Sequence, residues 1–211
     1  MKQVVDITVR LGPEMPLYPG DPAPMVERLT SIASGDPLTA SLLHLPAHAG
    51  THVDLPAHFI EGGRVLGDYT VDNFCGPGWV LDLGDVLSVI TRERLQTEEI
   101  PSDRHVLIKT RNSTLLRKPD FHHDYVYLDP PAVEYLLRRN PRSIGFDYYS
   151  LDPSSSETFP AHRLCAEAGL PVFVCLDLTR VEAGPWWFCG LPPAIPDVEG
   201  APVRAIVWRD T

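Results

Sequence analysis

Short apolar runs alternate with helix-type segments along this chain. Runs rich in β-branched and aromatic residues are typical of buried strands, and they predict strands at residues 4–9, 79–83, 106–110, 143–147, 171–176, 186–191 and 205–208. Apolar residues at helical spacing predict a helix that begins near Thr91 and two helices that span residues 131–140 and 161–168. Because strands and helices alternate without a linker or an internal repeat, the pattern predicts one α/β domain over residues 1–211.

The densest group of polar residues interrupts this pattern at residues 48–58, which hold three histidines and one aspartate. If this stretch is a strand, His48, His52 and Asp54 lie on one face, and Gly50 between them leaves space for an ion. In a helix, Asp54 would turn away from His48. Two imidazoles and a carboxylate on one face predict a metal site with open coordination positions, as in catalytic sites.

Composition and charge narrow the function classes. The net charge of -10 disfavours a nucleic-acid partner, because such partners are recognised by clustered Lys and Arg. No apolar stretch approaches the roughly 18 residues of a membrane span, and the first residues lack the apolar core of a signal peptide. The four cysteines are widely spaced, which predicts reduced thiols and a cytoplasmic location.

Residues 46–58 resemble the H-x-G-T-H-x-D-x-P-x-H signature of the cyclase family of metal-dependent hydrolases, which includes bacterial kynurenine formamidases and isatin hydrolases. The similarity extends from Asp6 to Trp208. It implies the swivelling β/β/α fold, with a mixed, partly barrel-like sheet and outer helices. It also implies a homodimer or a higher homo-oligomer.

The resemblance implies a chemistry for these side chains. A divalent ion held by His48, His52 and Asp54, either Zn²⁺ or Mn²⁺, would activate water for hydrolysis of an amide, imide or lactam. His58, on the loop expected after Pro56, would move a proton from the water to the leaving nitrogen. Residues 15–22 are similar to the family's aromatic-P-G-D-P segment, so Tyr18 either lines the substrate pocket or packs its own loop.

A second metal is not expected. Two-metal members of the family add a distal histidine and, twelve residues later, a glutamate. The distal histidine here is His162, and twelve residues on lies Val174, which cannot bind an ion. We therefore expect one metal per chain, with His162 as a weak fourth ligand, an outer group or a substrate-facing group, or simply as an ordinary helix residue. Asp177, three residues further along a strand, would face away from Val174.

Two alternatives from other classes remain open. His52, Asp54 and His162 also fit the two-histidine, one-carboxylate set of non-haem Fe(II) oxygenases, although this reading leaves His48 and His58 without a role. The chain could also be a non-catalytic metal or small-molecule binder on the same fold. Three other histidines are not expected at the site: His44 as a structural residue, and His122 and His123 as residues of a solvated loop.

Overall fold

The computed structural model describes residues 2–12 and 15–210. The strands are β1 (Lys2–Asp6), β2 (Met25–Thr30), β3 (Ala40–His44), β4 (His52–Asp54), β5 (Cys75–Asp82), β6 (Val89–Ile90), β7 (His105–Lys109), β8 (Tyr127–Leu128), β9 (Ser143–Phe146), β10 (Val172–Val174), β11 (Gly184–Leu191), β12 (Gly200–Pro202) and β13 (Arg204–Asp210). The helices are α1 (Arg92–Gln96), α2 (Asn112–Leu115), α3 (Pro130–Leu137) and α4 (Pro160–Glu167), with 3-10 turns η1 (Ile32–Ser34), η2 (Pro56–His58), η3 (Leu66–Asp68) and η4 (Val71–Asn73).

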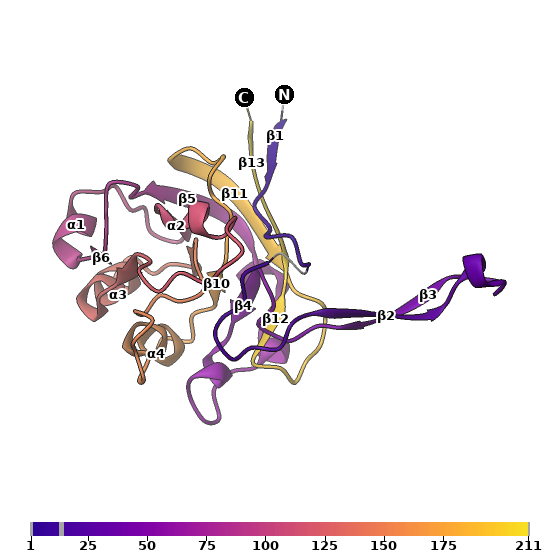
Figure 1. The fold of residues 1–211 in the computed structure, drawn as a ribbon. Helices are drawn as coiled ribbons and strands as arrows, with labels where there is room; N and C mark the ends of the chain where they lie inside the picture. Colours follow the sequence, from indigo (N-terminus) through magenta and orange to yellow (C-terminus); the bar gives the residue numbers. More distant parts are fainter. Residues whose placement is uncertain (1, 13–14, 211) are drawn as a thin grey trace.

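One mixed sheet organises the molecule. Its nine strands run in the order β1-β13-β11-β5-β7-β9-β10-β4-β12. Strands β5, β7, β9 and β10 are parallel, and antiparallel strands flank them on both sides. The sheet curls into a partial barrel, and the two chain ends lie side by side on β1 and β13 (Figure 1). The pattern of the sequence predicted an α/β domain, and the family resemblance implied the mixed, partly barrel-like sheet; the structure has both.

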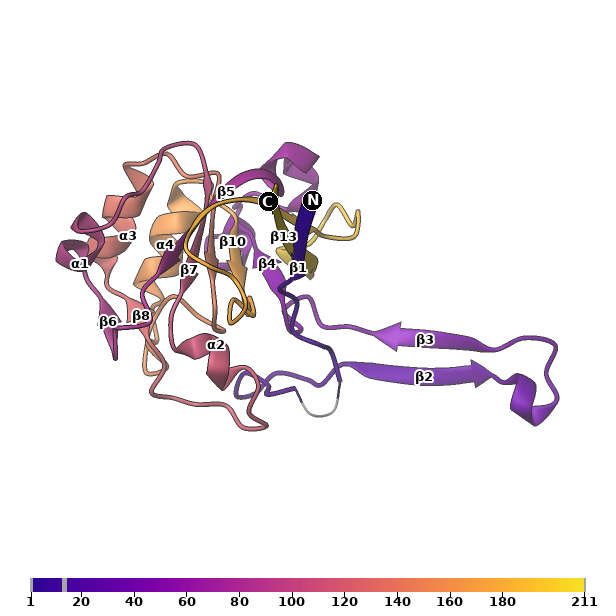
Figure 2. The ribbon, with the colours of Figure 1, turned by 90° about the horizontal axis from the view of Figure 1, so that it is seen from above.

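The two faces of the sheet carry different cores. Helices α1, α3 and α4 gather on one side of the sheet, as both views show (Figures 1 and 2). Val172 and Val174 of β10 pack into the core beneath these helices, whereas Phe173 points into a second core on the other face. Because neighbouring strands share faces, His52 and Asp54 of β4 project toward the helix side and Val53 toward the other.

The start of β4 lies where the parallel strands end. β4 runs antiparallel to β10, so that His52 is paired with Val174, the last residue of β10. In open α/β sheets, ligand sites form beyond the carboxyl ends of the parallel strands. The side chains at the beginning of β4 therefore occupy the position at which this architecture places a site.

A long hairpin of β2 and β3 projects from the body, well away from the helices (Figure 2). The sequence analysis did not predict these strands, because residues 25–30 and 40–44 lack a regular alternation of apolar and polar positions. His44 is on β3 and pairs with Glu27 across the hairpin at 3.0 Å. It lies outside the polar cluster of residues 48–58, as expected.

Most other elements match their expected positions with shifted ends. The first strand stops at Asp6 rather than residue 9, and Thr8 instead forms an isolated bridge with Leu176. Helix α1 begins after Thr91, whose hydroxyl accepts a hydrogen bond from the backbone N–H of Arg94, as its predicted capping role requires. Among the described residues, no helix has the length and apolar character needed to cross a membrane.

Candidate metal centre

The backbone of residues 48–58 differs from the single strand expected. His48 lies in a turn, and the chain reverses at Gly50, whose φ of +59° is in the left-handed region that favours glycine. A Cβ at Gly50 would lie 2.5 Å from Cδ2 of Leu11. The glycine is thus needed for a turn and for a close contact with Leu11, and not to leave space for an ion, as the sequence had suggested.

The turn nevertheless brings the expected side chains together around Asp54. Its Oδ1 lies 2.8 Å from Nδ1 of His48 and 3.2 Å from Nε2 of His52. Its Oδ2 lies 3.7 Å from Nε2 of His162, which comes from the first turn of α4. One buried carboxylate therefore faces one nitrogen from each of three imidazoles.

The other nitrogen of each imidazole is held by a group outside this cluster. Nδ1 of His52 contacts the carbonyl oxygen of Gly50 at 2.7 Å. Nδ1 of His162 is 2.7 Å from Oδ2 of the buried Asp152. Nε2 of His48 lies 3.3 Å from Oε1 of Glu199. Since metal-binding histidines almost always donate their second N–H to such an acceptor, this arrangement is typical of metal sites.

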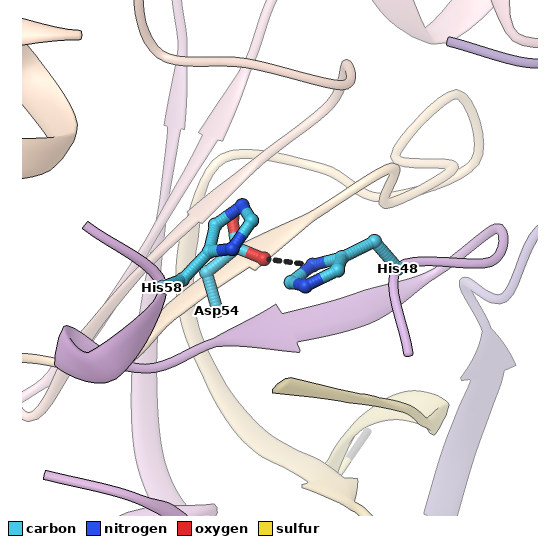
Figure 3. A group of neighbouring side chains, drawn as sticks. All are labelled: His48, Asp54 and His58. Carbon is cyan, nitrogen blue, oxygen red and sulfur yellow. Dashed lines mark hydrogen bonds and ion pairs between the residues drawn. The ribbon is translucent and has the colours of Figure 1, made fainter. Parts of the chain in front are cut away.

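The donor atoms also fit a divalent ion. Atoms from His48, Asp54 and His58 lie within 4.8 Å of one another (Figure 3). His58 is thus as close as a ligand, and His52 enters the set through its contact with Asp54. Nε2 of His162 is fully buried without a hydrogen-bond partner among the described residues, an arrangement that costs free energy unless a ligand binds there. Imidazole nitrogens and a carboxylate suit a transition-metal ion.

Burial and neighbouring charges shift the pKa values of these side chains in different directions. Burial opposes ionisation of Asp54, but His52 and His48 outweigh it and hold the pKa of the carboxyl well below its usual value. Burial also acts against a charge on His48, yet its contact with Asp54 raises the pKa of this imidazole. Burial lowers the pKa of His58, so this side chain is neutral at pH 7.

His58 lies beside the cluster on η2, a 3-10 turn that begins at Pro56, where a loop was expected. Its ring stacks on that of His48, with centroids 3.9 Å apart. Unlike the other three imidazoles, it has no outer acceptor among the contacts between described residues. A neutral imidazole that is not held by an acceptor is suited to proton transfer.

A cavity of about 380 Å³ opens above these side chains. The expected site residues all line it, namely Tyr18, His48, His52, Asp54, His58 and His162. The ring of Tyr18 also packs edge-on against Phe121, with ring centroids 5.3 Å apart. His122 and His123 are absent from the lining and lie on the loop before β8, as expected.

Comparisons with known proteins identify the relatives of this chain. The family model described as "Putative cyclase" matches residues 5–153. A curated kynurenine formamidase from Geobacillus thermodenitrificans is 31% identical over 210 residues, which cover 99% of both proteins.

The chain belongs to the cyclase family.

Solved structures show the same fold. A predicted metal-dependent hydrolase from Bacillus stearothermophilus is 26% identical, with a TM-score of 0.85 over 99% of this chain and 98% of that one. An isatin hydrolase bound to the product analogue thioisatinate is 21% identical, with a TM-score of 0.88 over 100% of this chain and 93% of the other. The resemblance of residues 46–58 to the cyclase family is thereby confirmed.

Val174 lies twelve residues after His162. At this position the resemblance implied a glutamate in two-metal members of the cyclase family. The Val174 side chain is fully buried and lies on the same sheet face as His52, its neighbour across the strands. Asp177 does not replace the missing carboxylate. Strand β10 ends at Val174, and the Asp177 carboxylate instead pairs with Arg117 at 2.8 Å.

Four acidic residues at the cluster or its cavity were not predicted as site residues, and one of them is Glu157, which lines the cavity. Asp152 holds His162, Glu199 holds His48, and Asp21 lines the cavity, where burial raises its pKa. Asp21 had a signal in the sequence, because it belongs to the P-G-D-P segment. Glu199 had no such signal in the sequence, because 151 residues separate it from His48.

Proposed function

We propose that this cyclase-family chain is a metal-dependent hydrolase that cleaves the C–N bond of an aryl formamide or a cyclic aryl amide, with residues 1–211 acting as one domain. The observation that carries the proposal is the buried Asp54 carboxylate, which faces one nitrogen of His48, His52 and His162. The kynurenine formamidase relative supports an amide bond as the one cleaved.

His48, His52 and Asp54 are proposed to hold a Zn²⁺ or Mn²⁺ ion, with His162 beside them. The bound ion would polarise a carbonyl oxygen and lower the pKa of water. His58 is neutral at pH 7, so it can accept a proton from the attacking water and return it to the leaving nitrogen. Asp54 remains ionised and keeps the neighbouring imidazoles in place.

The walls of the cavity support an aromatic substrate. Phe59 and Phe159 line the cavity with ring centroids 5.9 Å apart, and Tyr18 and Tyr149 line it as well. Phe59 also stacks on His162 at 4.7 Å, which fixes the orientation of its ring. Aromatic walls favour stacking with an aryl ring, and the polar groups of the cluster then face the bond to be cleaved.

The alternatives are not favoured. The set of His52, Asp54 and His162 required for an oxygenase does converge, but the relatives are hydrolases, and the oxygenase hypothesis gives no role to His58. A purely binding protein would not need a neutral imidazole over the cluster.

A substrate screen tests the proposed activity. We expect metal-dependent hydrolysis of at least one member of a panel of formyl anilides, isatin, cyclic imides and aryl esters, assayed with Zn²⁺ and with Mn²⁺. Chelation should abolish the activity, and exclusion of oxygen should leave it unchanged. Folded, metal-loaded protein that hydrolyses none of these compounds, or that consumes oxygen with ferrous iron, would contradict the proposal.

We expect one metal ion per chain. A second ion beside the first would lack the carboxylate that Val174 replaces, and the repulsion between two dications would not be offset. Metal analysis of protein purified without chelators should give one equivalent. In Val174→Glu, a new carboxylate would lie beside His52 and should allow a second ion to bind. Two equivalents in the wild-type protein would overturn the prediction.

A homodimer assembled through the β2–β3 hairpin is also proposed. Apolar side chains are exposed along both strands of the hairpin, namely Met25, Val26, Leu29, Leu42 and Leu43. An isolated two-stranded hairpin is marginally stable in water, so these side chains need a cover. An apolar hollow at the base of the hairpin, lined by Leu11, Leu45, Leu191 and Ile195, can receive the hairpin of a second copy.

The oligomeric state tests this assembly. Leu43→Asp should shift the protein from dimer to monomer in light scattering coupled to size-exclusion chromatography, because a charge would be buried in the interface. Leu87→Asp is a matched control, since Leu87 is 75% exposed and outside the hairpin. A wild-type protein that is monomeric at micromolar concentration would show that the hairpin has another role.

The cysteines bear on where the protein acts. All four belong to the part of the chain that the structure describes, and all are free thiols. Free thiols are the rule in reducing compartments, which supports the proposal of a cytoplasmic enzyme.

A further inference from the structure

We propose that Glu199 is a positioning residue that fixes the ring of His48, so that Nδ1 of His48 is the nitrogen that binds the metal. The proposal rests on the proposed function, since it requires His48 to be a metal ligand. It assigns a role to a residue outside both the signature of residues 46–58 and the matched family region.

The ring of His48 spans two carboxylates that lie on opposite sides of it. Nδ1 faces Asp54 at 2.8 Å, inside the cluster, and Nε2 faces Glu199 at 3.3 Å, on the outside. If Nε2 donates its proton to Glu199, Nδ1 is left with a lone pair directed toward the metal position when an ion is present. A ring flipped by 180° would direct carbon atoms at both carboxylates and lose both contacts.

The backbone around Glu199 leaves it little freedom. Its carbonyl oxygen accepts a hydrogen bond from the N–H of Leu55 at 2.9 Å, directly after Asp54. The next residue, Gly200, is the register partner of Asp54 between β12 and β4. Glu199 is therefore anchored to the same strand that carries two of the proposed ligands.

Gly200 completes the support beneath His48. A Cβ at this position would lie 2.8 Å from Cε1 of His48 and 2.7 Å from the carbonyl oxygen of Val53, so a side chain cannot fit. The His48 ring thus lies directly against the Gly200 backbone, while the side chain of Glu199 reaches its Nε2. Residues 199 and 200 together fix both the plane and the rotation of this ring.

Among the three imidazoles around Asp54, only His48 depends on a partly exposed outer partner. Asp152, which holds His162, is buried, and His52 is held by a backbone carbonyl. The side chain of Glu199 is 43% exposed. Its substitution therefore removes the partner of His48 Nε2 without leaving a buried cavity, which makes its contribution measurable.

Metal affinity, measured by competition with a chromogenic chelator, tests the proposal with Zn²⁺ and with Mn²⁺. Loss of an outer partner typically lowers metal affinity 10- to 100-fold, so we expect a loss in about this range for Glu199→Ala. Glu199→Gln should lose less, because its amide oxygen still accepts from Nε2. Asp197→Asn, an exposed acid on the same loop, should bind like the wild type. Melting temperatures of the metal-free variants should match that of the wild type.

A double-mutant cycle with His48→Ala separates the possible failures. If Glu199 acts through His48, Glu199→Ala should cause no further loss of affinity in the His48→Ala background. A loss as large as in the wild-type background would mean that Glu199 acts through its charge alone and would overturn the proposal, as would unchanged affinity in Glu199→Ala. Unchanged affinity in His48→Ala itself would instead refute the proposed ligand set.

Discussion

Asp54→Asn is expected to abolish tight metal binding and, with it, hydrolytic activity. The carboxylate is buried and faces three imidazoles, so it supplies the negative charge that a dication requires at the centre of the cluster. Even the loss of an outer partner costs 10- to 100-fold in affinity, and we expect a loss of more than about 100-fold for this central group. Metal content after gel filtration and the rate on the best substrate measure both effects.

Two further variants test whether the loss of metal and activity is specific to the metal centre. His52→Ala should behave in the same way, because its Nε2 faces the same carboxylate oxygen as His48. Asp72→Asn removes an exposed charge on η4 and should change neither metal content nor rate. Full metal content together with a full rate in either Asp54→Asn or His52→Ala would show that the metal centre has been misassigned.

His58→Ala is expected to retain its metal and to lose rate by about 10²- to 10⁴-fold, the range of general acid–base catalysis. The ring of His58 stacks on His48 without an outer acceptor, so its removal leaves the contacts of His48, His52 and His162 with Asp54 intact. His123→Ala, which removes an exposed imidazole from the loop before β8, is the control. Loss of metal in His58→Ala, with recovery in His58→Asn, would make His58 a ligand instead.

The dependence of the rate on pH provides a second test of His58. Burial lowers the pKa of this imidazole below its ordinary value of 6.5. The neutral form is the one that accepts a proton, so kcat/KM should rise with pH and reach its plateau through a midpoint below 6.5. In His58→Ala, this rise of kcat/KM with pH should be absent. A rise of the wild-type kcat/KM centred well above pH 6.5 would mean that another group controls the proton transfer.

The signature of residues 46–58 predicted which side chains meet, but its local geometry was misread. Alternation along a strand correctly places His52 and Asp54 on one face, because β4 is a strand. It fails for His48, since the left-handed turn at Gly50 ends the alternation. His48 still reaches Asp54 because the turn folds it back over the strand, and strand periodicity does not describe such a reversal.

Contacts between distant segments set the limit of what the sequence could reveal. Glu199 meets His48 because β12 pairs with β4, and neither the short β12 nor its pairing has a pattern in the sequence. The β2–β3 hairpin was not predicted for a related reason. Neither of its faces packs on the core of its own chain, so its apolar and polar residues do not alternate regularly.

The pairing of β1 with β13 has a consequence for the order of assembly during synthesis. Lys2 lies opposite Asp210, so β1 is synthesised long before the strand with which it pairs. Until residues 204–210 leave the ribosome, β1 has no partner and the β11 edge stays open, which is a template for unwanted strand addition. Glu199, like β13, is synthesised after all the histidines at the site. A nascent chain therefore contains His48, His52, His58 and His162 before it has either the closed sheet or the residue that holds His48, and tight metal capture is expected only after β12 and β13 have formed.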